Sequence, residues 1–410
     1  MKRHFVFPVF ILFSFFLFFG GSAAPDAPGP KYVFLFIGDG MGLAHVSLTE
    51  AYLAAKDGVH GSGNVSFTSF PVVGLVTTHS ANRLVTCSSA AATALATGHK
   101  TNNNMLGVAP DSVTRYTALT YPLHKAGYRI GIATSVSIDH ATPGGFYAQS
   151  VSRNRYYDIG SQAAGTGFEF FAGGGFIYPA GRTGDQPDIY AQLADAGYRI
   201  VRGPEGAAEL SSGAGKAVLV QHEGKDNHSL PYAIDRGDDD LTLSQITRAA
   251  IRVLDNPRGF FAMIEGGKID WAGHGNDAAT IIHEVVDFSD AIAIAVEFYR
   301  RHPDETLILV TADHETGGLA LGRDGSYSLL PTAYDEQSRS IDAAGKDRDA
   351  LREAVREIDK KAHVAWTTGG HTGIMVPLYA IGAGSERFAG KLDNTDIPNR
   401  ILAIMHQEWR

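Results

Sequence analysis

The chain has 410 residues and a formal net charge of −9, and it is 44% hydrophobic but only 19% charged, with 22 Phe and 16 Tyr. This composition excludes intrinsic disorder, and a net acidic chain is poorly suited to nucleic acid as its main ligand. A single cysteine excludes both a disulfide framework and a structural zinc site built from thiolates.

The first residues, 1–24, have the order of a Sec-type signal peptide. A short basic start is followed by an almost wholly apolar stretch, residues 5–19, and then by small residues up to Ala24. A membrane anchor is the alternative, but the apolar stretch is shorter than the roughly 20 residues that a span needs, and Pro8 interrupts it. We therefore expect cleavage near residue 24, and a periplasmic or secreted chain that no membrane holds.

Four apolar segments without hydrophobic alternation follow, at residues 32–37, 128–134, 260–264 and 306–311. Continuous apolar runs of this length are typical of parallel strands buried on both faces. Helical patterns alternate with them, and one such pattern begins at a capping box over residues 242–245. The alternation predicts an α/β fold with a central, mainly parallel sheet flanked by helices on both faces.

Length alone would suggest two or three domains, but chemically informative motifs are spread along the whole chain. We therefore expect a single catalytic domain over residues 25–410, with surface insertions near 155–240 and 322–365. The first insertion is rich in glycine and loops, and the second contains a mixed-charge helix near 347–357. The acidic run at 238–240 resembles a metal cluster, but we interpret it as the approach to a helix N-terminus.

Three of the predicted strands run into a carboxylate within a few residues. These carboxylates are Asp39, Glu265 and Asp313, and His314 follows the last of them. Ligands of open α/β sheets bind beyond the carboxyl ends of the strands. One acid after a strand is usually a turn residue, whereas three acids at one edge of a sheet indicate a site.

Further metal-ligating side chains follow. Asp270 and His274 are four residues apart, and His371 lies in a glycine-flanked loop. A lone histidine is usually a surface or core residue, so the groups are considered together. Carboxylate and imidazole ligands without thiolate suit a catalytic zinc. Six groups are enough for two ions that share a substrate: Asp39, Asp270, His274, Asp313, His314 and His371.

Ser88 is the candidate nucleophile because it stands where a helix over residues 88–97 is predicted to begin. Unpaired N–H groups and the helix dipole at that point favour an alkoxide and a bound phosphate. The alternative is that the serine is an ordinary helix cap without a catalytic role, which is the more common case for a Ser-Ser-Ala-Ala run. Arg153 could hold an oxyanion with its guanidinium, but this signal is also weak alone.

Together these motifs resemble the alkaline phosphatase family, in the family's order and from residue 39 to residue 371. The motifs are Asp39-Gly40-Met41-Gly42, Val85-Thr86-x-Ser88, Ala141-Thr142-Pro143 with Arg153 eleven residues after Thr142, Glu265-Gly266 leading to Ile269-Asp270 and His274, Thr311-Ala312-Asp313-His314, and His371-Thr372-Gly373. The resemblance implies the family fold, usually as a homodimer, and hydrolysis of small-molecule phosphate monoesters. It also implies two Zn²⁺ and one Mg²⁺ per chain.

The resemblance further assigns roles to individual residues. Asp270, His274 and His371 match the ligands of one zinc. Asp39, Asp313 and His314 match those of the second, with Ser88 beside it. Asp39, Thr142 and Glu265 match the magnesium ligands. Arg153 matches the arginine that clamps phosphate. The implied reaction is attack by Ser88 on phosphorus, which gives a phosphoseryl intermediate that water then hydrolyses.

The chain departs from the commonest family pattern at three positions. Cys87 stands where an aspartate usually precedes the serine, so we expect Arg153 to be less firmly oriented, and we interpret the thiol itself as inert. His140 replaces an acidic residue near the magnesium site, and Trp271 replaces a lysine or histidine after Asp270. The identity of the third metal, Mg²⁺ or Zn²⁺, stays open for this reason.

Other activities would use the same ligands. A phosphodiesterase, sulfatase or phosphomutase of the superfamily would retain the metal sites, but Ser88 and Arg153 favour monoesters. Cys87 lacks the following Pro-x-Arg that a sulfatase resemblance would require. A non-catalytic, exported metal- or phosphate-binding protein is the alternative from another class, and Ser88 beside a full ligand set argues against it.

Overall fold

The computed structural model describes residues 29–213, 215–222 and 228–409. The expected signal peptide, residues 1–24, lies outside this part of the chain. Among the described residues, no helix is both long enough and apolar enough to cross a lipid bilayer.

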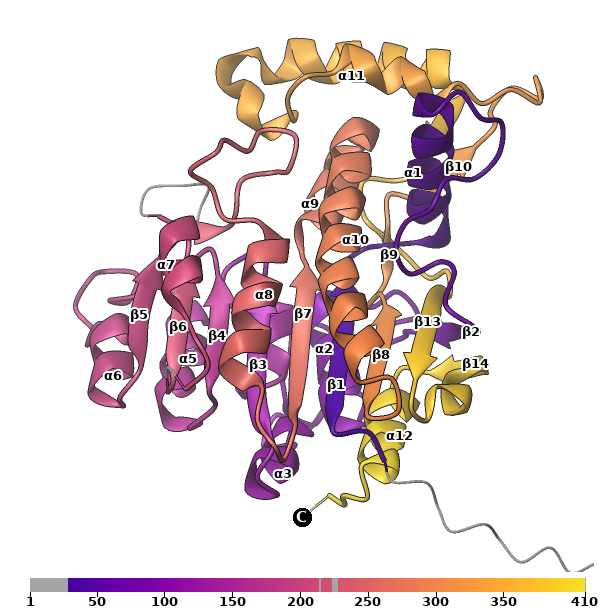
Figure 1. Ribbon diagram of the computed structural model, residues 1–410. Coiled ribbons are helices and arrows are strands. Elements are labelled where there is room, and N and C mark those ends of the chain that lie inside the picture. Colours follow the sequence, from indigo (N-terminus) through magenta and orange to yellow (C-terminus); the bar gives the residue numbers. More distant parts are fainter. Residues whose placement is uncertain (1–28, 214, 223–227, 410) are drawn as a thin grey trace, which may run out of the picture.

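A ten-stranded sheet forms the centre of the molecule (Figure 1). Its strands are, in spatial order, β14 (Gly390–Asp393), β2 (Val72–Thr77), β13 (Val376–Gly382), β8 (Thr306–Thr311), β1 (Tyr32–Gly38), β7 (Phe260–Gly266), β3 (Arg129–Thr134), β4 (Phe170–Gly173), β6 (Ala217–Val220) and β5 (Arg199–Arg202). Only β13 runs antiparallel to its two neighbours, β2 and β8. The expected central, mainly parallel sheet is therefore confirmed.

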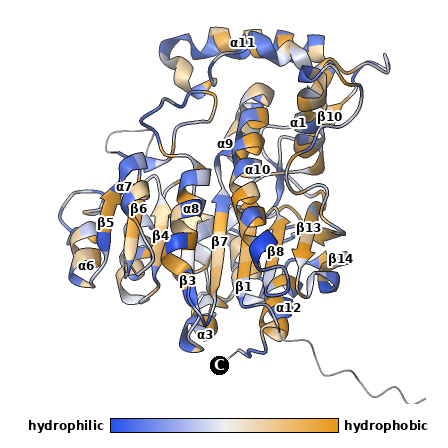
Figure 2. Cartoon of the chain, viewed as in Figure 1, coloured by the Kyte–Doolittle hydropathy of each residue, from blue (hydrophilic) through white to orange (hydrophobic). Residues whose placement is uncertain are grey.

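The central strands form where the sequence has its continuous apolar runs. Every residue of β1, β7 and β8 is buried, and these strands are among the most hydrophobic parts of the chain in Figure 2. A strand covered on both faces gains from apolar side chains on both. β1 lies between β7 and β8, in parallel register with each. The carboxyl ends of all three strands therefore meet at one edge of the sheet.

Helices cover both faces of the sheet, as expected. Two long helices, α8 (Leu243–Leu254) and α10 (Ala278–Arg301), pack on the face nearer the viewer in Figure 1, and α2 (Ser88–Thr97), α4 (Ala141–Gly145) and α12 (Asp396–Ile404) lie on the opposite side. The other helices are α1 (Leu43–Lys56), α3 (Thr120–Lys125), α5 (Tyr156–Gly160), α6 (Ile189–Asp195), α7 (Gly203–Glu209), α9 (Lys268–Gly275) and α11 (Arg348–Ala362).

The segment expected to be a loop-rich insertion, residues 155–240, is more regular than its composition suggested. It contributes β4, β5 and β6, which extend the sheet beyond β3. These strands are only four residues long and lie between glycines. Short strands of this kind give a weak periodicity signal, which explains why the sequence pattern did not predict them.

The second segment, residues 322–365, lies above the carboxyl edge of the sheet in Figure 1. It carries the predicted mixed-charge helix as α11, preceded by the 3₁₀ turns η3 (Pro331–Glu336) and η4 (Asp342–Asp347). The small hydrophobic cluster that joins it to α1 and α10 includes Leu48, Ile282, Tyr334 and Ile358. Two short ribbons, β10 (Leu319–Leu321) with β11 (Val364–Trp366) and β9 (Glu315–Thr316) with β12 (His371–Thr372), connect the segment to the sheet.

The capping box predicted at the start of α8 is present and gives a stability prediction. The Gln245 amide donates to Thr242 Oγ1 at 3.0 Å, and the Thr242 amide donates to Gln245 Oε1 at 3.0 Å. Thr242→Ala is expected to lower the free energy of unfolding by about 1 kcal/mol, because it removes the cap acceptor. Urea denaturation followed by circular dichroism measures this change. The Thr242→Ser control keeps a hydroxyl acceptor, so an equal loss in both variants would contradict the capping role.

Candidate metal centre and active site

The three carboxylates predicted to meet at one edge of the sheet do so. Asp39 follows β1, Asp313 follows β8, and Glu265 is the penultimate residue of β7 rather than a residue after it. All three side chains are fully buried. Three acids in a water-excluded space repel one another and lose hydration, so they need positive charge nearby.

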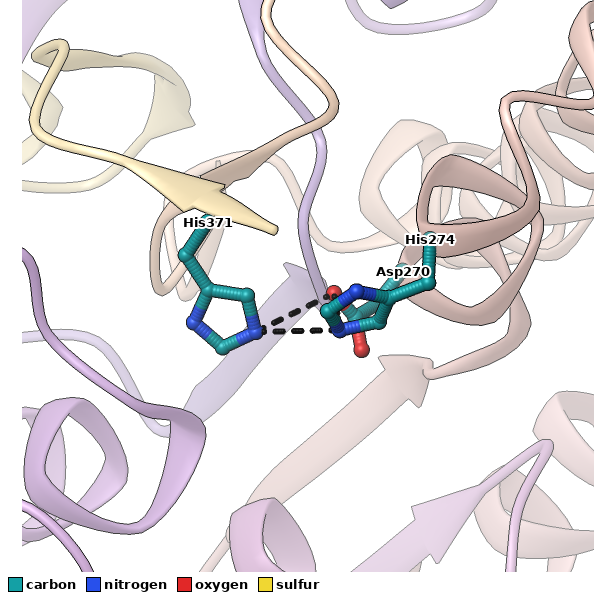
Figure 3. Close-up of side chains that lie close together, drawn as sticks. All are labelled: Asp270, His274 and His371. Atoms are coloured by element: carbon teal, nitrogen blue, oxygen red, sulfur yellow. Dashed lines mark hydrogen bonds and ion pairs between the residues drawn. The ribbon is translucent and has the colours of Figure 1, made fainter. Parts of the chain in front are cut away.

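A first candidate ligand cluster joins α9 to β12 (Figure 3). Asp270 and His274 lie one helical turn apart on α9, and His371 reaches them from β12. The Nε2 atoms of the two histidines are 3.2 Å apart, and Asp270 Oδ1 lies 3.4 Å from His274 Nε2 and 3.6 Å from His371 Nε2. These separations match the edges of about 3.3 Å in a tetrahedron with Zn–N bonds of about 2.0–2.1 Å.

Backbone carbonyls orient both imidazoles of this cluster. His274 Nδ1 lies 2.7 Å from the Gly369 carbonyl oxygen, and His371 Nδ1 lies 2.9 Å from that of Thr86. Because a carbonyl oxygen only accepts, each Nδ1 must carry the proton and donate it. A neutral imidazole held this way presents its Nε2 lone pair, which is the arrangement that metal-binding histidines use.

A second cluster adjoins the first. His314 Nε2 lies 3.4 Å from Asp39 Oδ1 and 3.2 Å from Asp313 Oδ2. The two clusters meet because β9, directly after His314, pairs with β12, which begins at His371. The imidazole rings of His314 and His371 stack, with their centroids 3.6 Å apart and their planes at 20°.

A third group lies on the other side of Asp39. Asp39, His140 and Glu265 present ligand atoms within 4.8 Å of one another. Burial raises the pKa of Glu265, and Thr142, in the first turn of α4, is close enough to Glu265 to oppose part of that shift. The expected magnesium ligands are thus neighbours, and His140 adds an imidazole to them.

Burial shifts much of the site towards neutral forms, with the Asp270–His274 ion pair as the exception. Loss of hydration raises the pKa of Asp39, brings that of Asp313 to about 6 and brings that of Glu265 to about 7. The same cause lowers the pKa of His314 and His371 to about 4. Carboxylates that are hard to ionise and imidazoles that are hard to protonate are both stabilised in their ligating forms by a bound cation.

Several buried polar atoms of the site have no hydrogen-bond partner among the described residues. They are both carboxylate oxygens of Asp39, Asp313 Oδ2, Glu265 Oε1 and Thr142 Oγ1. Unpaired buried oxygens are rare in folded proteins and destabilise the fold unless something binds them. Oxygen atoms gathered in this way, with imidazole nitrogens between them, fit divalent metal ions.

Ser88 is the first residue of α2, as predicted, and its side chain faces the metal ligands. Its Oγ lies 3.3 Å from His314 Nε2, and Arg153 Nη1 donates to it at 3.4 Å. The neighbouring Ser89 is also buried, but its Oγ lies 3.2 Å from Cys87 Sγ instead. Only the first serine of the pair therefore contacts the site.

Arg153 is held differently from the expectation that its orientation would be loose. Its Nη2 donates to His140 Nε2 at 3.2 Å, so His140 supplies an acceptor although no carboxylate stands at position 87. Burial, followed by the charge of Arg153, lowers the pKa of His140 to about 3, which keeps that nitrogen free to accept. Cys87 acts on the backbone: its Sγ accepts from the Asn104 amide at 3.1 Å, and the Asn104 carbonyl accepts from the Arg153 amide at 2.8 Å.

Sequence reasoning missed Thr316 and did not explain why the motif has glycine at position 40. Thr316 Oγ1 donates to Asp270 Oδ1 at 2.5 Å and lies 3.2 Å from His314 Nδ1. Its spacing of two from His314 was the available signal, because residues i and i+2 of an extended segment share a face. Gly40 has φ +71°, and a Cβ there would lie 2.8 Å from Thr316 Oγ1, so this motif position requires glycine.

Comparison with known proteins agrees with this geometry. The family model "Alkaline phosphatase" matches residues 30–169 and 215–407. Alkaline phosphatase 3 of Bacillus subtilis (strain 168) is 33% identical, over 92% of this chain and 89% of the relative. The crystal structure of a cold-active alkaline phosphatase from a psychrophilic Shewanella sp. has a TM-score of 0.81 at 29% identity, over 91% of this chain and 99% of that one.

A further structure is a histidine-to-aspartate variant of the alkaline phosphatase from the Antarctic bacterium TAB5, with Mg bound in its M3 site. It is 30% identical, with a TM-score of 0.74 over 93% of this chain and 100% of that one. The fold and the clustered ligands are those of a metal-dependent hydrolase. The chain belongs to the alkaline phosphatase family, whose members are phosphoric monoester hydrolases.

The ion pair within the first cluster gives a prediction for metal binding. The hydrogen bond to Asp270 raises the pKa of His274 to about 9. At pH 8 the His274 imidazole of the metal-free chain is therefore mostly protonated at Nε2 as well as at Nδ1. A metal must displace that proton to reach Nε2. Zinc binding to the metal-free protein is therefore expected to release at least about one proton at pH 8, and fewer at pH 10, where His274 is already neutral.

Isothermal titration calorimetry in two buffers with different ionisation enthalpies measures this release at each pH. The comparison of pH 8 with pH 10 serves as the internal control, because protein, metal and cluster are the same. Equal release at both pH values would show that His274 does not carry the displaced proton.

Proposed function

We propose that the chain is an exported alkaline phosphatase that hydrolyses phosphate monoesters to an alcohol and inorganic phosphate through a phosphoseryl intermediate on Ser88. One observation carries this proposal. Ser88 Oγ lies at a helix N-terminus, within 3.3 Å of a metal-ligand histidine and 3.4 Å of a guanidinium nitrogen of Arg153. A nucleophile, an anion clamp and metal ligands thus converge on one point, as phosphoryl transfer requires.

The residues fit two Zn²⁺ and one Mg²⁺ per chain. One zinc would be held by Asp270, His274 and His371, the second by Asp39, Asp313 and His314 with Ser88 beside it, and the magnesium by Asp39, Thr142 and Glu265. The unpaired oxygens described above support the second and third sites. Asp39, Thr142 and Glu265 offer oxygen ligands, which Mg²⁺ prefers, whereas His140 could bind Zn²⁺ through nitrogen only if it gave up its hydrogen bond from Arg153.

The chain's own residues account for most of the proposed reaction. When bound, the metal ions supply Lewis acidity that favours the serine alkoxide and the departing alkoxide. Ser88 attacks phosphorus in line, and the α2 N-terminus stabilises the added negative charge. The Arg153 guanidinium binds two non-bridging phosphate oxygens and balances charge in the transition state. The bond between phosphorus and the ester oxygen breaks, and the alcohol leaves. Water then attacks the phosphoserine, the bond between phosphorus and Ser88 Oγ breaks, and inorganic phosphate and the Ser88 hydroxyl are formed.

Export and assembly complete the proposal. The N-terminal composition supports a periplasmic or secreted location, with no membrane attachment after removal of residues 1–24, and the N-terminus of the mature protein can be read by mass spectrometry. Exposed apolar side chains beside the site, Leu84, Val85, Ile374 and Met375, support a homodimer that buries them. Light scattering measures the oligomeric state directly.

Ser88→Ala is expected to lower kcat by several orders of magnitude while metal content stays intact, because the nucleophile is lost but the ligands remain. Ser89→Ala is the matched control, since Ser89 faces Cys87, and it should change kcat little. A chromogenic phosphate monoester, a diester and a sulfate ester assayed side by side separate the competing activities. Phosphate trapped at acidic pH on Ser89, or faster turnover of the diester or the sulfate ester, would refute the proposal.

Removal of the metals is expected to abolish activity, and zinc together with magnesium should restore more activity than either ion alone, because the clusters offer chemically different ligands. Elemental analysis of the reactivated protein gives the stoichiometry. Active protein with less than about one zinc per chain would contradict the assignment.

A further inference from the structure

A buried lysine next to the active site has no evident role in the chemistry. Lys268 is the first residue of α9, two positions before Asp270, and only 2% of its surface is exposed. Its Nζ lies 3.7 Å from the centroid of the Tyr232 ring and 4.8 Å from that of Trp271, and it donates to Ser229 Oγ at 3.3 Å. An ammonium group removed from water is destabilising unless its surroundings compensate.

Part of the compensation is electrostatic. Glu284 of α10 is fully buried, and the positive charge of Lys268 opposes the effect of burial on the Glu284 pKa. The two aromatic rings contribute as well, because their faces attract a cation, most strongly for an indole. The ammonium and the Trp271 ring therefore hold each other in place.

The contacts continue from Trp271 to the site. The Trp271 ring meets the His140 ring in a T-shaped arrangement, with centroids 5.9 Å apart and planes at 71°. His140 Nε2 in turn accepts the hydrogen bond from Arg153 Nη2. Four side chains thus form a continuous row from the core to the nucleophile: Lys268, Trp271, His140 and Arg153.

The Tyr232 ring, which packs against Lys268 at the start of this row, is also fixed. The Tyr232 hydroxyl donates to Asp342 Oδ2 at 3.0 Å, and Asp342 is the first residue of η4 in the second insertion. The ring that faces Lys268 is therefore tethered to the segment that lies above the edge of the sheet.

We propose that Lys268 is a positioning residue for Arg153. Its ammonium fixes the indole of Trp271, the indole fixes the ring of His140, and His140 fixes the guanidinium with its remaining N–H groups directed at phosphate. The row supplies the orientation that an aspartate at position 87 would otherwise give. The inference rests on the proposed function, in which Arg153 binds phosphate.

The test uses the zinc- and magnesium-loaded enzyme with inorganic phosphate as the probe. Lys268→Met keeps an unbranched side chain that is one atom shorter and removes its charge. The Kd for phosphate, measured by calorimetry, should rise about three- to tenfold, which is the range that a lost cation–π contact supports. KM for a monoester should rise with it, by more than kcat changes. Lys268→Arg keeps the cation and should restore most of the affinity.

A matched control exists elsewhere in the chain. Lys216 Nζ lies 4.7 Å from the Tyr198 ring centroid, next to the strands at the far edge of the sheet. Lys216→Met removes the same kind of contact and should leave phosphate affinity unchanged. Metal content is measured for every variant, because Lys268 is close in sequence to Asp270.

A double-mutant cycle with Arg153→Ala separates positioning from general stabilisation. Lys268→Met should have no further effect on phosphate affinity once Arg153 is absent. Trp271→Phe, a second variant if Lys268→Met folds poorly, should behave in the same way. Equal weakening in both backgrounds, unchanged affinity in Lys268→Met, or a loss explained by missing zinc overturns the inference. If Arg153→Ala itself leaves phosphate affinity unchanged, the role of Arg153 in the proposed function fails as well.

Discussion

The structure depends on a concentration of negative charge that the fold forces out of water. Parallel β1, β7 and β8 end at the same edge, and each delivers a fully buried carboxylate to it. Such a group is stable in its ionised form only when cations lie among its members. The histidines, Ser88 and Arg153 are arranged around these carboxylates, so the proposed ligand set would serve stability as well as catalysis.

The same constraint explains why so much of the site is supported by rigid elements. His274 and His371 are oriented by backbone carbonyls, and His314 is placed by the pairing of β9 with β12. Asp39 belongs to two ligand clusters at once. Because one carboxylate belongs to both groups, a metal ion bound in one of the proposed sites would change the charge felt at the other. The proposed metal sites would therefore be coupled through the β1 terminus.

The sequence alone predicted those parts of the molecule whose signal is local. The apolar runs of β1, β7 and β8 lie where expected, and so do the α8 capping box and the helix start at Ser88. Contacts between distant segments could not be predicted in the same way. The pairing of β9 with β12 involves two residues in each strand, too few for any periodicity. The strands within 155–240 were missed for a similar reason, since each is four residues long.

The environment of Arg153 shows why a substitution is hard to interpret without its neighbours. In the sequence, Cys87 stands where the family pattern has an aspartate, and Arg153 is therefore expected to be less firmly oriented. In the structure, the thiol fixes the backbone through Asn104, and His140 accepts the guanidinium hydrogen bond. A neutral imidazole can accept that bond only while its Nε2 is unprotonated, and burial beside a positive charge keeps it so. The departures at Cys87 and His140 therefore form one compensating arrangement, in which the loss of an anionic partner is matched by a neutral acceptor held in the core.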